Sequence, residues 1–277
     1  MTTCPNALTV DLEDWYHICG TGRAAEVSSW DAYESRVTRN TAKVLSLFRT
    51  HRARATFFVL GYIAEREPGL IADIAKEGHE IATHGHFHRR VFEMSEEEFS
   101  EDVDRSMDAI SSAGGGRVIG YRAPEWSIRP HTPWALRILR GKGIRYDSSM
   151  VPLTRMGDRS FPTSPCGIPT EEGEILEFPL TTVRCFGEHL PFTGGLPLRL
   201  MPYFYVLSRI RRMNAAGDAA MVYIHPWEFD PEQPRIELPL SRRIMHYFNL
   251  RSTPGKISGL LANLRFAPLR DVLGIGH

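Results

Sequence analysis

The sequence predicts an α/β protein in which buried strands alternate with helices. Short apolar runs of strand length recur along the chain, and most are followed by a segment with the spacing of an amphipathic helix. Ionisable residues follow several of these runs directly, at the strand ends where parallel α/β folds place their sites. This alternation favours parallel strands joined by crossover helices, arranged as a barrel or a doubly wound sheet.

The expected strands are short and mostly apolar. They lie at 7–10, 55–59, 80–83, 118–121, 144–146, 176–178 and 219–224. The expected helices lie at 30–49, 68–77, 95–113, 132–141, 198–214, 241–249 and 254–264. Ser95 and Glu98 have the spacing of a capping box. Residues 158–173 are rich in Ser, Pro, Thr and Gly, so we expect a loop there.

Composition and charge narrow the function classes. The 277 residues include 33 basic and 33 acidic ones, so net charge gives no reason to expect nucleic acid or an anionic membrane as a partner. The cluster of Arg209, Arg211 and Arg212 is interpreted as a solvated helix face. No apolar run is long enough for a transmembrane helix. A homo-oligomer is compatible with the sequence.

Cysteine usage and the N-terminus predict a cytoplasmic protein. The first residues lack the basic and apolar regions of a signal peptide. The four cysteines show no CxxC spacing, so reduced thiols are expected.

Three histidines in five residues follow the strand at 80–83 and indicate a metal site. Imidazole is a common zinc ligand, and a carboxylate completes a hydrolytic site with open positions. We expect His84 and His88 to face one ion and His86 to point elsewhere. The alternative is a polar turn that happens to be rich in histidine.

The first strand ends in an acidic cluster of Asp11, Glu13 and Asp14. One acid could bind the metal, and another could take a proton from a metal-bound water. Alternatively, one of them caps a helix or pairs with Arg122, and Asp14 is the strongest candidate for a structural role. Because side chains two apart share one face of a strand, Glu13 is expected beside Asp11.

Two further residues at strand ends complete the predicted site. Arg122 could orient the base carboxylate and keep it ionised, or it could be an ordinary surface arginine. His225 could protonate the departing amine, although a histidine after a buried strand is often a core residue.

These motifs resemble those of the polysaccharide deacetylase family, carbohydrate esterase family four. The segments TVDLED, GHEIATHGHFH, GYRAPEW and VYIHPWEF stand in the order of its motifs, and ATFFVLG is also typical. The resemblance covers about residues 5–230. VDLEDWYH, FTGG and HPWEFDPEQPRI are similar to the deacetylases found with exosortase and exopolysaccharide loci, and residues 231–277 resemble their C-terminal extension.

The resemblance implies a distorted (β/α) barrel of about seven strands, in a single domain with the extension packed on it. Residues 1–230 would form the catalytic domain and residues 231–277 the extension. It implies a metal-dependent N-deacetylase of N-acetylhexosamine units in a bacterial polysaccharide, with Zn²⁺ or another divalent ion such as Co²⁺, Ni²⁺ or Mn²⁺. A membrane-associated glycan-assembly machinery is a possible partner.

Carried over residue by residue, Asp11 is the base, His225 the acid and Arg122 the residue that orients Asp11. His84 and His88 bind the metal. Many members have two adjacent aspartates, whereas this chain has an acid-x-acid pattern. That pattern suggests Glu13 as the third ligand, with Asp14 as the alternative. The usual glycine after R-x-P is absent, which puts the shape of the substrate groove in doubt.

The substrate would meet aromatic faces and exposed backbone. Trp126, Tyr146 and Trp227 could offer ring faces to sugars. A backbone N–H near Asp147 could bind the oxyanion. Gly194 and Gly195 could let the glycan approach the backbone closely. The aromatic candidates could equally be core residues, and the two glycines could mark only a turn. The rival functions are hydrolysis of a small cyclic amide or ureide, as by an allantoinase, and glycan binding by an inactive homologue.

Overall fold

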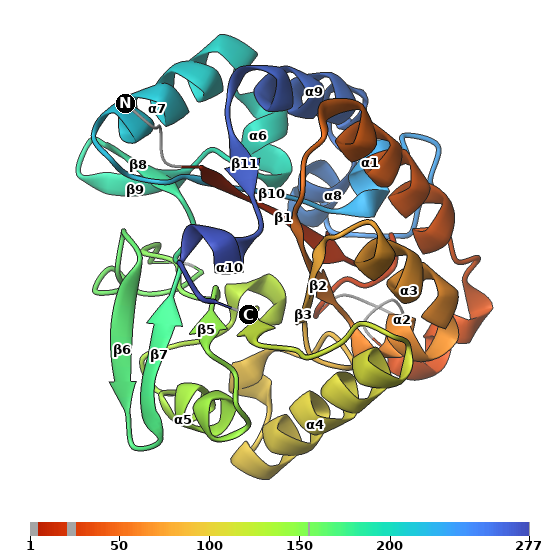
Figure 1. Cartoon of the computed structure of the whole chain (residues 1–277). Coiled ribbons are helices and arrows are strands. Elements are labelled where there is room, and N and C mark those ends of the chain that lie inside the picture. The colour runs from red at the N-terminus through yellow and green to blue at the C-terminus, as the bar shows by residue number, and fades with distance from the viewer. Residues whose placement is uncertain (1–4, 21–25, 155, 277) are drawn as a thin grey trace.

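The computed structural model describes residues 5–20, 26–154 and 156–276. Its main sheet has the order β10-β1-β2-β3-β4-β5-β7-β6, and β11 also pairs with β1 (Figure 1). The strands that pair in parallel are β1 (Asn6–Leu12), β2 (Thr56–Val59), β3 (Glu80–Thr83), β4 (Gly120–Tyr121), β5 (Tyr146–Asp147), β7 (Gly173–Glu177), β10 (Met221–Ile224) and β11 (Phe266–Ala267). β6 (Cys166–Thr170) runs antiparallel to β7. β8 (Thr182–Cys185) and β9 (Glu188–Pro191) form a separate hairpin.

The sheet curls into a distorted barrel, which confirms the predicted fold class. In the described part of the chain, no ladder joins β7 to β10. The segment after β7 closes this gap instead, because the Met221 N–H donates to the Thr181 hydroxyl at 2.7 Å. Gly194 adds a parallel bridge to Tyr223 of β10. Irregular closure of this kind is the distortion that the sequence resemblance implied.

Helices cover the outside of the barrel (Figure 1). They are α1 (Val37–His51), α2 (Gly61–Arg66), α3 (Pro68–Lys76), α4 (Glu96–Ser112), α5 (Trp134–Gly141), α6 (Gly195–Leu200), α7 (Tyr203–Ala215), α8 (Leu240–Tyr247), α9 (Thr253–Asn263) and α10 (Leu269–Val272). Short 3₁₀ turns include η2 (Val27–Ala32) and η5 (Pro226–Phe229). Ser95 and Glu98 form the predicted capping box at the start of α4. No described helix is long and apolar enough to cross a membrane.

Several predicted boundaries were wrong. The first long helix begins at Val37 rather than Trp30, because Val27–Ala32 forms a 3₁₀ turn. The predicted helix at 198–214 is divided at Pro202, which cannot donate a backbone hydrogen bond. The predicted loop at 158–173 contains β6, which pairs with β7.

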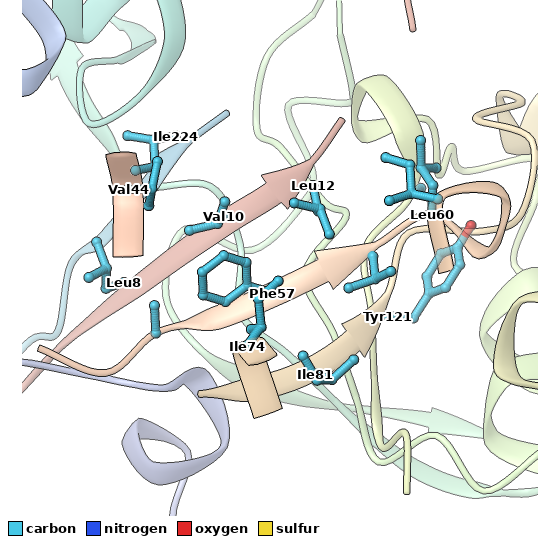
Figure 2. Close-up of a cluster of buried hydrophobic side chains, with 14 of the residues drawn as sticks. Leu8, Val10, Leu12, Val44, Phe57, Leu60, Ile74, Ile81, Tyr121 and Ile224 are labelled. Atoms are coloured by element: carbon cyan, nitrogen blue, oxygen red, sulfur yellow. The ribbon is translucent and has the colours of Figure 1, made fainter. Parts of the chain in front are cut away.

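Alternation along β1 fixes which side chains reach the barrel interior. Leu8, Val10 and Leu12 point outward and pack with apolar residues of the covering helices, such as Val44 of α1 (Figure 2). Ala7 belongs to the separate interior cluster with Phe58 of β2. Thr9 and Asp11 share the face of Ala7, since side chains alternate along a strand. Asp11 therefore lies at the inward-facing carboxyl end of β1, where the candidate site is found.

The C-terminal residues pack on the barrel. β11 lies beside β1, and the Leu269 N–H donates to the Thr56 hydroxyl of β2. α9 contacts α1. The division of the chain at residue 230 stays a prediction.

Candidate active site

Glu13, His84 and His88 converge into a buried group whose donor atoms lie within 4.8 Å of one another. Glu13 Oε1 is 3.0 Å from His84 Nε2 and 2.9 Å from His88 Nε2. Burial alone would raise the pKa of Glu13, but the charges of His88 and His225 and the contacts with the imidazoles of His84 and His88 hold it well below its ordinary value. The carboxylate is therefore ionised, as a metal ligand must be.

The hydrogen bonds of His84 suit a cation at this position. Its Nδ1 is 2.7 Å from the Arg122 carbonyl oxygen, which can only accept, so Nδ1 carries a proton. In a neutral imidazole, Nε2 then presents a lone pair to the Glu13 carboxylate. Two lone pairs facing each other repel, and a metal ion between them removes the conflict. The donor set thus fits a divalent ion that accepts nitrogen and oxygen ligands.

His88 is held in place by Cys19. The buried Cys19 Sγ lies 3.3 Å from His88 Nδ1 and 3.1 Å from the His88 carbonyl oxygen. His88 has φ +51°, in the left-handed region that a residue with a side chain adopts at a cost. Cys19 therefore contacts both the ring and the strained backbone of one candidate ligand, leaving His88 Nε2 to face Glu13. Sequence reasoning missed this residue, since the spacing of Cys19 relative to His88 carries no signal.

Replacing Cys19 by alanine should weaken metal binding by about 10- to 100-fold, because partners behind a metal-binding imidazole contribute on that scale. Cys19→Ser retains a hydrogen-bonding group and should lose less affinity. Competitive titration with a zinc indicator measures both variants. Equal affinities for the wild type and Cys19→Ala would rule out this role for the thiol.

Asp14 points away from this group and organises the start of α1. Its Oδ2 accepts hydrogen bonds from the backbone N–H groups of Arg36 and Val37 and from the Ser35 hydroxyl. The side chain thereby satisfies amide donors at the first turn of α1.

Asp11 connects Arg122 to His225. Arg122 Nη1 donates to Asp11 Oδ1 at 2.6 Å, and the other oxygen of Asp11 is 3.9 Å from His225 Nε2. Arg122 is fully buried and is fixed by further donations to Thr9 Oγ1 and Ser148 Oγ. The guanidinium therefore has little freedom to leave Asp11, whose carboxylate lies next to the Glu13 group.

A buried carboxylate behind His225 orients its ring. Glu228 Oε1 lies 2.9 Å from His225 Nδ1, and Glu228 Oε2 lies 3.0 Å from Arg199 Nε. Burial alone would lower the pKa of His225, but the negative charges of Glu13, Glu228 and Asp11 and the hydrogen bond to Glu228 raise it overall. Sequence reasoning missed Glu228 and Arg199. The capping-box spacing of Glu228 to His225 was a usable signal, whereas Arg199 had none.

The remaining predicted residues lie in different surroundings. Tyr146 is fully buried, and its hydroxyl donates to Glu80. It is therefore a core residue, the alternative to a sugar-binding role. Asp147 is also buried, and burial raises its pKa to about 6. Trp126 is buried against the Arg122 guanidinium. The amides of Ser148 and Met150 already donate to Tyr121 and Glu177, so these two are not free for an oxyanion.

Trp227 and the two glycines lie near His225. The Trp227 ring stacks on His225 at a centroid separation of 4.8 Å. A Cβ at Gly194 would meet the Tyr223 ring at 2.1 Å, and Gly195 has φ +53°. Glycine at these two positions is therefore required by packing and backbone conformation alone.

Two family models match different parts of this chain. Residues 26–145 match the model of the polysaccharide deacetylase family, and residues 148–274 match a domain of unknown function, DUF3473. Each match covers less than half of the chain. His84, His88 and Arg122 lie inside the deacetylase match, whereas His225 and Glu228 lie inside the DUF3473 match.

Individual proteins are similar to a part of the chain in sequence or to most of it in fold. A segment of the chain resembles a peptidoglycan-N-acetylglucosamine deacetylase of Bacillus cereus, with 34% identity over 90 residues, which is 32% of this chain and 30% of that protein. The chain thus spans less than a third of that relative's length. A solved structure of a polysaccharide deacetylase from Mycobacterium smegmatis aligns over 98% of this chain and 89% of its own, with TM-score 0.67 and 22% identity. A solved allantoinase shares the fold, with TM-score 0.62 and 15% identity over 96% of this chain and 87% of its own.

Proposed function

We propose that this protein is a metal-dependent N-deacetylase of a bacterial polysaccharide. The observation that carries the proposal is the convergence of the Glu13, His84 and His88 group with the Asp11–Arg122 pair and His225 at one edge of the barrel. A buried group of two imidazoles and one carboxylate beside a second carboxylate suits hydrolysis of an amide.

Glu13, His84 and His88 would hold the metal, and zinc is the ion we favour for two imidazoles and a carboxylate. The orientation of the Asp14 carboxylate toward α1 favours Glu13 as the third ligand. A bound divalent ion supplies Lewis-acid chemistry, lowering the pKa of a water and polarising the acetyl carbonyl.

Asp11 and His225 would move the protons. Asp11, held by Arg122, is placed to accept a proton from the attacking water. His225 donates a proton to the nitrogen of the departing amine, and Glu228 holds its ring by Nδ1 so that Nε2 faces Asp11. The two groups lie 3.9 Å apart, so one substrate amide can reach both.

The substrate we favour is a polymer with N-acetylhexosamine units, acted on during exopolysaccharide biosynthesis. One relative is named a peptidoglycan-N-acetylglucosamine deacetylase, which supports an N-acetylated glycan as the substrate class. The exopolysaccharide role is supported by the resemblance of residues 231–277 to the C-terminal extension of deacetylases at exopolysaccharide loci. Trp227 would support the His225 ring rather than bind a sugar, because it is buried and stacks with both His225 and His246.

The decisive experiment measures acetate released from N-acetylglucosamine oligomers by the metal-loaded protein and by protein treated with a chelator. Acetate should form only with metal present. The proposal fails if no divalent ion supports acetate release. Hydrolysis of allantoin without acetate release from the oligomers would identify a cyclic ureide hydrolase. Binding of the oligomers without turnover would identify an inactive homologue.

Glu228→Gln should shift the pH dependence of acetate release. Loss of the Glu228 charge lowers the pKa of His225, which is raised in the wild type. A general acid must be protonated, so the alkaline limb of the kcat profile should move to lower pH. An unchanged alkaline limb would show that His225 is not the acid or that Glu228 does not tune it.

A further inference from the structure

Outside the candidate active site, the surface of the protein carries an apolar face on α6, α7 and α8. Large apolar side chains there are exposed to solvent, and they are Leu200, Phe204, Tyr205, Leu240, Ile244, Met245 and Phe248. Phe204 is 79% exposed, Leu240 68% and Leu200 54%. We call these residues the α6–α8 face. Exposed apolar residues gathered in this way mark interaction sites on soluble proteins.

The residues of this face are connected through α8. Leu240 and Ile244 lie four residues apart on one side of α8, and Phe248 follows the helix as its C-cap. The end of α8 is tied to α6, because Arg199 donates to the carbonyl oxygens of Met245 and Phe248. Leu200, the next residue after Arg199, therefore lies beside the end of α8. In Figure 1, α6 and α7 follow one another at the edge of the barrel next to β10.

The segments that build this face are strongly basic. Residues 195–217 and 238–248 contain six arginines and no aspartate or glutamate, although the whole chain is electrically balanced. Within the described part of the chain, four of these arginines form no ion pair, namely Arg209, Arg211, Arg212 and Arg243. Arg211 and Arg212 lie two turns after Phe204, on the same side of α7.

We propose that the α6–α8 face docks on an anionic lipid bilayer. The protruding apolar side chains would insert between the acyl chains, and the arginines that form no ion pair would bind the negative headgroups above them. A second copy of the chain fits less well, since a two-fold pairing of this face would set its arginines against each other. In this proposal Arg209, Arg211 and Arg212, which the sequence analysis interprets as a solvated helix face, bind the lipid headgroups.

Docking through α8 would place the candidate active site beside the membrane. Arg242 of α8 donates to Glu125, which follows the Arg122 motif. His246 of α8 stacks on Trp227, which in turn stacks on His225. The membrane proposal itself does not depend on the chemistry of the site, so the two can fail separately.

Sedimentation with lipid vesicles tests the proposal. The full chain should bind vesicles that contain phosphatidylglycerol more tightly than vesicles of phosphatidylcholine alone, and added salt should weaken the binding. Phe204→Ser and Leu240→Ser should each reduce the partition coefficient about tenfold. Arg243→Glu should reduce it at least about fivefold.

Matched controls lie outside the face. Phe186→Ser removes a fully exposed aromatic from the tip of the β8–β9 hairpin, and Arg117→Glu reverses an exposed arginine before β4. Both variants should bind vesicles like the wild type. The proposal is overturned if the controls lose as much binding, if both vesicle types bind equally, or if the wild type is a dimer that Phe204→Ser and Leu240→Ser convert to a monomer.

Discussion

His84→Ala should abolish measurable acetate release and weaken metal binding by more than about 100-fold. The imidazole is one of only three side chains in the described donor group, and its Nε2 lies 3.0 Å from Glu13. Removing it leaves a buried, ionised carboxylate with a single imidazole partner. Metal content after dialysis and acetate release report the two effects separately.

Asp14→Asn is the matched control for this prediction, because Asp14 is the alternative third ligand. Its carboxylate binds the backbone N–H groups of Arg36 and Val37, so the substitution should lower the free energy of unfolding by about 1–2 kcal/mol. Metal affinity should stay close to that of the wild type. Loss of metal in Asp14→Asn together with its retention in Glu13→Gln would show that the ligand assignment is reversed.

Much of the barrel could be predicted because local pattern and tertiary structure agree. The strand at Glu80–Thr83 is a short segment after Gly78 with Ile and Ala at its centre, and its predicted bounds match the structure residue for residue. The capping box at Ser95 likewise depends on residues three apart in the chain. Strand alternation also underlies the expectation that Glu13 lies beside Asp11, since that period follows from strand geometry alone.

Contacts between distant segments could not be predicted in the same way. β6 has alternating burial and becomes a strand only because β7 lies beside it. The start of α1 depends on Asp14, which is more than twenty residues away in sequence. Arg199 looked like any helix arginine, yet it is buried against Glu228 and the end of α8. In each case the deciding partner comes from another part of the chain, where periodicity carries no information.

Asp11→Asn should lower kcat for acetate release by about 10²- to 10⁴-fold while leaving metal bound. The amide keeps the size of the carboxylate but cannot accept a proton from water, and Asp11 is not among the three donor residues. The substitution also leaves the Arg122 guanidinium, fully buried, without its ionised partner, so the free energy of unfolding should fall by about 3–5 kcal/mol. Measuring kcat, metal content and thermal unfolding on one preparation separates these effects. Loss of the metal from a folded Asp11→Asn protein would assign Asp11 to the metal, and the base would then have to be sought elsewhere. Retained metal with retained activity would instead remove Asp11 from the chemistry, leaving it as the carboxylate that balances the charge of Arg122.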